Sequence, residues 1–399
     1  MSAYSPRRTG SRLAALGAVL CLVGCATPVF DQARALHHGG DSAGALVALE
    51  SAEADVPERD RLVYLLERGT LELHSNAFDA AARSFVAAVD YIDEQDRISL
   101  RDEARALLTS EATTRYTGES SERLLAHSYA MLSFLLAGNA ESAAVEARRA
   151  TQRLQAGDDE LAAANVTRAL IALSFEMAGQ TNDAYVAARS LPADTLPATT
   201  TRLARRLGSS EARQPVPVDL EAAHADARGE LILVVSSGQV SRKFSSHLHN
   251  GIDWQIAFPA YPSYRPSPAA TRIAFDTDAL PPAETARSDI DGLARASLDA
   301  RAGRLLLRQG MRLAAKSRVA DELRNSDDLA TQLLAFAILV SEVADTRGWY
   351  ALPARLELWR VPVPPAATTL TVSAGAASQV IDLGALRFNA GPRIRLLRF

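Results

Sequence analysis

The pattern of apolar positions changes once along the chain, near residue 208. Between residues 30 and 190, apolar residues recur at helical spacing and short polar turns interrupt them. After residue 228, apolar runs of strand length alternate with loops rich in proline and glycine. This change predicts a helical N-terminal half and a C-terminal half that is built mainly from strands.

Four similar turns divide the helical half. Each begins with a glycine or an asparagine and is followed five residues later by an alanine, and the four pairs are Gly40 and Ala45, Asn76 and Ala81, Gly138 and Ala143, and Gly179 and Ala184. A helix-like segment lies on both sides of each turn. The pattern resembles the tetratricopeptide repeat, a helix-turn-helix unit of about 34 residues.

The second copy fits the repeat best, since its small, small, aromatic and small positions are Gly69, Ala81, Phe85 and Ala88. The third and fourth copies have Ala147 and Ala188 where a large apolar residue is expected, and an insertion at 99–119 makes the spacing irregular. We predict a degenerate repeat array over residues 25–207, with an irregular alanine-rich bundle as the alternative. Such arrays rarely catalyse reactions, and their concave face binds a peptide, a helix or another domain.

The C-terminal half begins after a predicted linker at 208–228, which contains glycine, serine and proline. A helix is expected over 290–316, with Ser288 and Asp289 as its N-cap, and a buried helix over 329–344. The predicted strands are 230–235, 240–248, 253–258, 273–275, 354–359, 369–373, 380–383 and 393–399. The order of these elements along the chain, strands followed by a helical pair and then further strands, predicts an α+β sandwich domain over 229–399. We expect a mainly antiparallel sheet with helices on one face.

The N-terminus carries a targeting pattern. Three arginines precede a short apolar run at 13–22, and small residues then lead into Cys25. This order is typical of a secretory signal, and the run is about half as long as a membrane-spanning helix. A plain signal peptide that happens to contain a cysteine is the alternative interpretation.

The four residues Leu22-Val23-Gly24-Cys25 resemble the lipobox of bacterial lipoproteins. The resemblance implies that residues 1–24 are removed and that Cys25 receives a diacylglyceryl group and becomes the new N-terminus. Ala26 follows, where an aspartate would retain the protein in the inner membrane. We therefore predict a lipid-anchored outer-membrane protein that faces the periplasm.

Composition narrows the function further. The net charge is -4, so no strong overall field favours nucleic acid or an anionic membrane surface. Cys21 lies within the predicted signal and Cys25 would be acylated, so the mature chain would have neither a disulfide nor a catalytic thiol. No phosphate-binding loop, zinc-ligand spacing or catalytic carboxylate pair is present. We therefore predict a non-enzymatic protein with no catalytic residues, cofactor, metal or nucleic-acid partner.

One segment of the C-terminal half carries a family resemblance. Residues 344–355 read Ala-Asp-Thr-Arg-Gly-Trp-Tyr-Ala-Leu-Pro-Ala-Arg. Together with 145–150 and 182–184, they resemble a poorly characterised family of bacterial envelope lipoproteins that share an Ala-Asp-x-Arg-x-Trp-x-x-Leu-Pro motif. The resemblance implies a tetratricopeptide-like half joined to this C-terminal domain, a role in cell-surface assembly and no enzymatic activity.

The motif contains the main candidate site, Asp345, Arg347 and Trp349. An arginine that forks onto an anion beside an indole could bind a carboxylate or a sugar. In the alternative, which we favour, Asp345 and Arg347 fix a corner between two elements while Trp349 fills the core. The three residues are therefore a candidate for either a ligand site or a structural corner.

Other patterns are weaker candidates. His247 and His249 would share one strand face and could begin a metal site, but a third ligand is missing, so surface histidines are favoured. His37 and His38 are expected at a helix end, where partly charged rings suit the helix dipole. Arginines recur at every fourth position in one predicted helix, as a solvated or binding face, and these are Arg304, Arg308 and Arg312.

From these patterns we predict an outer-membrane lipoprotein that serves as a protein-binding scaffold in cell-envelope assembly. The acyl anchor would hold it on the membrane, and the helical array would bind envelope proteins. The alternative is a periplasmic lipoprotein that binds a ligand or glycan through its C-terminal domain.

Overall fold

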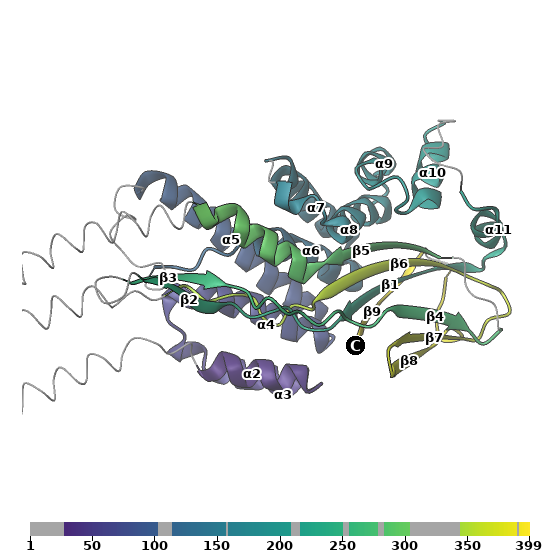
Figure 1. The fold of residues 1–399 in the computed structure, drawn as a ribbon. Coiled ribbons are helices and arrows are strands. Elements are labelled where there is room, and N and C mark those ends of the chain that lie inside the picture. The colour runs from purple at the N-terminus through teal and green to yellow at the C-terminus, as the bar shows by residue number, and fades with distance from the viewer. Residues whose placement is uncertain are drawn as a thin grey trace, which may run out of the picture.

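The structure is a computed structural model of residues 1–399. It describes residues 28–102, 114–156, 159–208, 216–249, 255–277, 283–303, 344–388 and 391–399. The described residues combine a helical array with antiparallel and mixed β-sheets, so the predicted mixture of α and α+β structure is confirmed (Figure 1). Three predicted features lie outside the described residues: Cys25, the arginines 304, 308 and 312, and the predicted helix 329–344 apart from its last residue.

Helices fill the N-terminal half, and from α2 to α10 each one packs against the next along the chain. Helix α6 also packs against α4 and α8, so alternate helices form an inner row. The helices are α2 (Pro28–His38), α3 (Ser42–Ser51), α4 (Arg61–His74), α5 (Phe78–Asp102), α6 (Ser120–Leu136), α7 (Ala140–Gln155), α8 (Asn165–Met177), α9 (Thr181–Arg189), α10 (Pro197–Arg206) and α11 (Val218–Asp226). In the described part of the chain, no helix is long and apolar enough to cross a membrane.

The four predicted turns join the helices into hairpins. In each turn one residue has a positive φ, and these are Gly40, Asn76, Gly138 and Gly179. The amide of the next residue then bonds back to a carbonyl five positions earlier, as in Asn139 N to Phe134 O (2.8 Å). This left-handed turn closes a helix and reverses the chain. The alanines that follow, Ala45, Ala81, Ala143 and Ala184, are fully buried where the two helices meet.

Gly69 shows why one hairpin needs a glycine. A Cβ placed on Gly69 in α4 would lie 2.9 Å from the ring of Phe85 in α5. Such a contact is too short for carbon atoms, so only glycine allows the ring to pack this closely. The small and aromatic positions of the second predicted repeat thus form one tightly packed contact.

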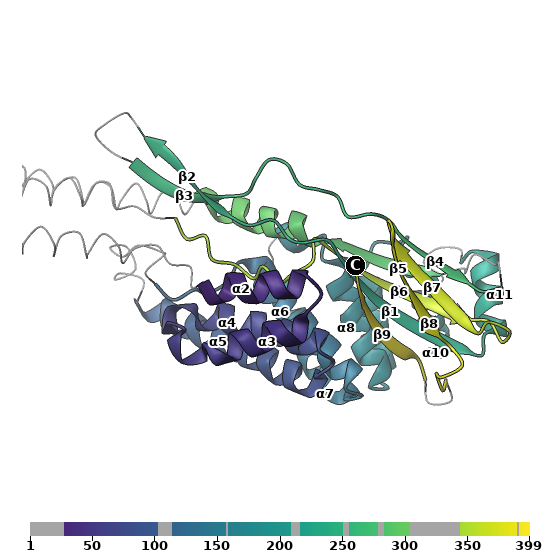
Figure 2. The same cartoon turned by 90° about the horizontal axis from the view of Figure 1, so that it is seen from below.

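Nine strands make up the β-structure of the described residues, and they are β1 (Gly229–Ser237), β2 (Phe244–His249), β3 (Gln255–Ala260), β4 (Thr271–Phe275), β5 (Glu284–Asp289), β6 (Arg355–Val363), β7 (Thr369–Ala374), β8 (Ala377–Asp382) and β9 (Arg393–Arg398). The central sheet has the order β5-β6-β1-β9, and only β1 and β9 pair in parallel. Strands β4, β7 and β8 form a second antiparallel sheet. The β2–β3 hairpin extends away from both sheets (Figures 1 and 2).

The central sheet is covered on both faces. One set of its side chains, including Ile232, Val234 and Leu358, belongs to the same core as the helical array. The alternate set, including Leu233 and Val361, packs against the β4-β7-β8 sheet. Because successive side chains of a strand point to opposite faces, the continuous apolar run of β1 serves both cores. Helix α8 of the N-terminal half packs directly on β5 and β6.

Two elements differ from the sequence-based expectations. Strand β5 was not predicted, and its last residue, Asp289, accepts a hydrogen bond from Gly292 N (2.9 Å) at the start of the helical stretch 290–303. Asp289 therefore caps this helix, as the sequence predicted. The predicted linker 208–228 contains α11, whose Leu220 is buried.

Candidate functional site

The segment that contains Trp349 lies against the inner row of array helices. Its indole is 1% exposed and packs against the rings of Phe85 and Tyr129, with centroid distances of 5.7 and 5.0 Å. The indole Nε1 donates to Thr70 Oγ1 at 2.9 Å. Trp349 therefore fills a space among α4, α5 and α6 and joins the two halves of the chain.

Two carboxylates of the array hold the backbone of this segment. Glu122 in α6 accepts from the amide of Trp349 (2.7 Å), and Glu67 in α4 accepts from the amide of Tyr350 (3.0 Å). Arg34 in α2 donates to both Glu67 (2.8 Å) and the carbonyl of Gly348 (3.2 Å). The array thus binds an extended segment of its own chain through main-chain contacts and one aromatic anchor.

Asp345 and Arg347 form a corner beside this anchor. Arg347 donates from Nε and Nη2 to the two carboxylate oxygens of Asp345, both at 2.8 Å, and from Nη1 to Asp60 Oδ1 at 3.0 Å. Burial acts to raise the pKa of Asp345, but the bonds from Arg347 outweigh it and the pKa lies below its ordinary value. All of these partners belong to the chain itself, so the geometry favours the structural corner over the ligand site.

A buried ion pair that was not predicted lies next to the corner. Lys243 Nζ donates to Glu119 Oε1 at 2.8 Å, and both side chains are almost completely buried. Arg301 from the helical stretch 290–303 donates to the same oxygen at 2.7 Å. Burial raises the pKa of nearby Glu122, whose second oxygen accepts from Tyr116 OH at 2.5 Å. These contacts attach three separate segments to the start of α6.

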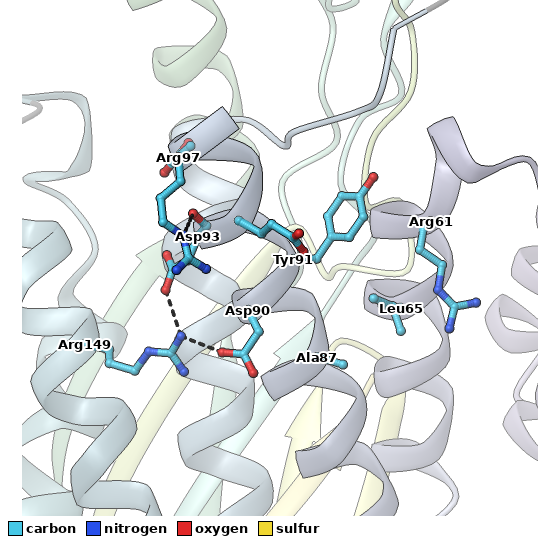
Figure 3. Close-up of a pocket in the computed structure, with 10 residues that line it drawn as sticks. Arg61, Leu65, Ala87, Asp90, Tyr91, Asp93, Arg97 and Arg149 are labelled. Atoms are coloured by element: carbon cyan, nitrogen blue, oxygen red, sulfur yellow. Dashed lines mark hydrogen bonds and ion pairs between the residues drawn. The ribbon is translucent and has the colours of Figure 1, made fainter. Parts of the chain in front are cut away.

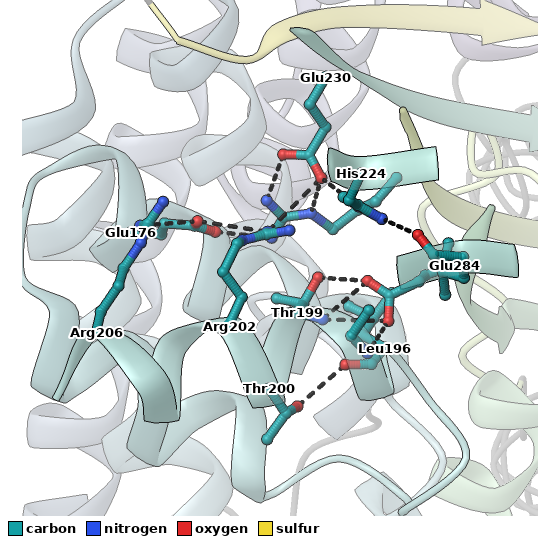
Figure 4. Close-up of polar contacts among 12 residues, drawn as sticks. Glu176, Leu196, Thr199, Thr200, Arg202, Arg206, His224, Glu230 and Glu284 are labelled. Atoms are coloured by element: carbon teal, nitrogen blue, oxygen red, sulfur yellow. Dashed lines mark hydrogen bonds and ion pairs between the residues drawn. The ribbon is translucent and has the colours of Figure 1, made fainter. Parts of the chain in front are cut away.

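A second charged cluster joins the far end of the array to the central sheet (Figure 4). Arg360 in β6 is 1% exposed and donates twice to Glu230 in β1, at 2.9 and 2.6 Å, and once to Glu176 in α8, at 2.7 Å. Burial acts to raise the pKa of both carboxyls, but Arg360 outweighs it and both pKa values are lowered. Such a pair is costly to break, because each partner would remain buried and charged.

Strand β5 contributes two polar side chains that satisfy helix N-termini of the array. Glu284 accepts from the amide and hydroxyl of Thr199 in α10 (3.0 and 2.6 Å) and also from the amide of Ala198 (Figure 4). Ser288 Oγ accepts from the amide of Val166 in α8 (2.9 Å). The first amides of a helix have no partner within the helix, so β5 supplies caps from the other half of the chain.

The histidine candidates have different environments. His247 on β2 is exposed, and its Nε2 lies 3.2 Å from Ser245 Oγ. His37 and His38 lie at the end of α2, as expected, but burial lowers their pKa values to about 2 and about 4, with a smaller contribution from Arg398. Both rings are therefore neutral at physiological pH, which differs from the partly charged rings that were expected. Within the described parts, no three histidine, cysteine or acidic side chains are grouped as a metal site.

An open groove lies on the outer side of the array, along α4, α5 and α7 (Figure 3). Its volume is about 1020 Å³, and it is lined by Arg61, Leu65, Ala87, Asp90, Tyr91, Asp93, Glu94, Asp96, Arg97 and Arg149. Four of these side chains are acidic, and all four belong to α5.

The charges in the groove follow helical spacing. Asp90, Asp93 and Glu94 are three and four residues apart, so they lie on one face of α5. Arg149 of α7 bridges two of them, since Nη2 lies 2.8 Å from both Asp90 and Asp93. Asp90 is still 63% exposed, and for Glu94 the described residues provide no ion-pair partner. The α5 spacing is visible in the sequence, but the prediction overlooked it.

No known protein family matches this chain, and no curated protein matches it either. The family resemblance of residues 344–355 therefore stays a prediction. What the geometry adds is the place of that segment: it occupies the inner side of the array, while the groove along α5 stays open.

Proposed function

We propose that the protein is an outer-membrane lipoprotein, anchored through Cys25 and facing the periplasm, that serves as a non-enzymatic protein-binding scaffold in envelope assembly. The helical half is a degenerate tetratricopeptide-like array in this proposal. Its four similar turns, its buried alanines and the inner row formed by α4, α6 and α8 support that interpretation.

The open groove of Figure 3 is the observation that carries the proposal. Arrays of this kind bind partners on their concave inner face, but here Trp349 and the central sheet occupy that side. A partner must then use the outer side. The exposed carboxylates of Asp90 and Glu94 are one helical turn apart and fit a partner segment that carries lysine or arginine side chains.

The alternative, a ligand- or glycan-binding lipoprotein that uses Asp345, Arg347 and Trp349, has less geometric support. Trp349 is almost completely buried, and Arg347 already bonds to two carboxylates of its own chain. A ligand at these residues would have to displace the segment that joins the two halves.

Charge reversal in the groove tests the scaffold proposal. In the double variant Asp90→Arg and Glu94→Arg, arginines in the groove would face the lysine or arginine side chains of the partner. We therefore expect about tenfold less envelope partner to be crosslinked in cells and purified with the protein. The matched control is Asp226→Arg, an exposed position at the end of α11. Equal recovery of the same partner with all three proteins would overturn the role of the groove.

Removal of the acylated thiol tests the anchor. We expect Cys25→Ser to move the protein from the outer-membrane fraction to the soluble periplasmic fraction, since serine cannot accept the thioether-linked lipid. Fractionation and detection of the protein with an antibody measure this change. A protein that stays with the outer membrane after the substitution would contradict the lipid anchor and leave the groove test unaffected.

A further inference from the structure

A second cavity lies where the end of α2 meets the C-terminal strand, and it shares no lining residue with the groove along α5. Its volume is about 650 Å³. Three parts of the chain line it: the α2–α3 turn, the end of α4, and the ends of β1 and β9 together with β8. The lining residues are His38, Gly39, Gly40, Ser42, Leu73, His74, Asn76, Gly238, Gln239, Gln379, Leu396, Arg398 and Phe399. Neither the corner at Trp349 nor the proposed scaffold function uses this cavity.

The cavity holds a cation that has no carboxylate partner among the described residues. Arg398 donates from Nη1 to the carbonyl of His37 at 2.6 Å, and its other side-chain contacts are the ring nitrogens of His37 and His38 at 3.3 and 3.4 Å. No aspartate or glutamate belongs to the lining. Phe399, the last residue of the printed sequence, also lines the cavity, and an oxygen of its carboxylate accepts from the amide of Gly238 at 3.2 Å. A half-buried arginine with only neutral acceptors leaves positive charge available to a ligand.

The histidines present further donors. Because Arg398 can only donate, Nδ1 of His37 and of His38 must accept, and Nε2 then carries the proton in both rings. The Nε2 of His37 is buried and has no partner in the described structure. The rings of His38 and His74 line the cavity itself, beside the guanidinium. The ring of His38 already bonds to the main chain of Tyr350, so His74 is the ring that can offer an N–H to a ligand. Asn76 and Gln239 add side-chain amides at the rim.

We propose that this cavity binds the oxyanion of a small hydrophilic molecule, either a phosphate ester or a carboxylate. Arg398 would pair with the oxyanion, His74 would donate to one of its oxygens, and Asn76 and Gln239 would bond to the hydroxyl groups of the rest of the molecule. One water occupies about 30 Å³ in the liquid. The cavity volume of about 650 Å³ therefore leaves room for a molecule several times larger than a bare ion.

The electrostatics of the two rings that line the cavity, His38 and His74, agree with an anion site. Burial lowers the pKa of His38 and of His74 to about 4, and Arg398 lowers both further. The charged groups that act on His38 are Arg398, Arg242 and Arg34, and all of them are cations. A bound oxyanion would oppose these cations and favour the protonated rings, so it should raise both histidine pKa values.

Histidine NMR on the full chain in detergent tests the proposal, with inorganic phosphate, glucose 1-phosphate, glucuronate and neutral glucose as probes. We expect saturable shifts of the His38 and His74 ring signals and raised pKa values with at least one of the three anions, and no saturable shift with glucose. Tightest binding of glucose 1-phosphate would identify a phosphate ester, and tightest binding of glucuronate a carboxylate. Equal binding of all three would show that the oxyanion alone is recognised.

Two variants make the result specific. Arg398→Met should weaken anion binding by about tenfold or more, whereas Arg395→Met, an exposed position on the same strand, should leave it unchanged. If Arg398→Met does not fold, His74→Asn replaces it, with an expected loss of several-fold in affinity. The proposal is wrong if no anion gives a saturable shift, if glucose binds as well as the anions, or if a folded cavity variant binds like the unchanged protein. None of these outcomes depends on the groove along α5.

Discussion

Replacement of Trp349 with alanine should lower the free energy of unfolding by about 3–5 kcal/mol, because it removes the largest side chain that joins the two halves. The rings of Phe85 and Tyr129 would face a cavity, and Thr70 Oγ1 would lose the indole N–H. Urea denaturation followed by circular dichroism measures the change. A loss below about 1 kcal/mol would mean that the segment is not anchored here.

A matched pair of conservative variants separates packing from hydrogen bonding. Trp349→Phe removes the hydrogen bond to Thr70 as well as part of the ring volume. It should lower the free energy of unfolding by about 1 kcal/mol more than the loss of ring volume alone would. Trp359→Phe is the control, since the Nε1 of Trp359 is buried and has no hydrogen-bond partner in the described structure. Trp359→Phe should therefore cost less than Trp349→Phe, and the reverse order would contradict the assigned contact.

Replacement of Arg360 with methionine should cost about 3–5 kcal/mol at neutral pH, since it leaves the carboxylates of Glu176 and Glu230 buried without their main partner. Arg202 and Arg206 lie 3.4–3.6 Å from Glu176 and compensate only in part. An exposed control on the same sheet, Arg395→Met, should change stability by less than about 0.5 kcal/mol.

The same cluster predicts a pH dependence. In the folded protein the pKa values of Glu176 and Glu230 lie below the ordinary value of 4.5, so the stability they contribute is present above pH 4.5 and is lost as the pH falls through the folded pKa values. In Arg360→Met the unpaired carboxyls should favour the protonated form, and acid should stabilise the variant relative to the unchanged protein. Urea denaturation at neutral pH and near pH 4 should therefore show a smaller difference in acid. A difference that grows in acid would contradict the account.

The sequence predicted those elements whose local pattern is strong. The four hairpin turns could be found because a glycine or asparagine must adopt a positive φ there. Strand β1 could be found because both of its faces are buried, which makes its apolar run continuous. These features depend on residues that are close together in the sequence.

Strand β5 could not be found, because its inward positions include Glu284 and Ser288 instead of apolar residues. These side chains cap α10 and α8, and such a role is invisible until the two halves are packed together. The partners of Lys243 and Arg360 were missed for the same reason, since a buried charge depends on residues that are distant in the sequence. The sequence singled out Asp345, Arg347 and Trp349 as one candidate, but the contact of Trp349 with the inner side of the array was not foreseen.

Site-specific photocrosslinking in cells tests the central claim, that a partner protein binds in the open groove along α5. A photoreactive phenylalanine analogue would replace Tyr91, which lines the groove, and Val218 on α11, which is 84% exposed, would be the control position. The account predicts a discrete adduct at position 91, in which an envelope protein is joined through a segment rich in lysine or arginine. This adduct should disappear when Asp90→Arg and Glu94→Arg are also present. The absence of an adduct at position 91, or the same adducts at both positions, would contradict it.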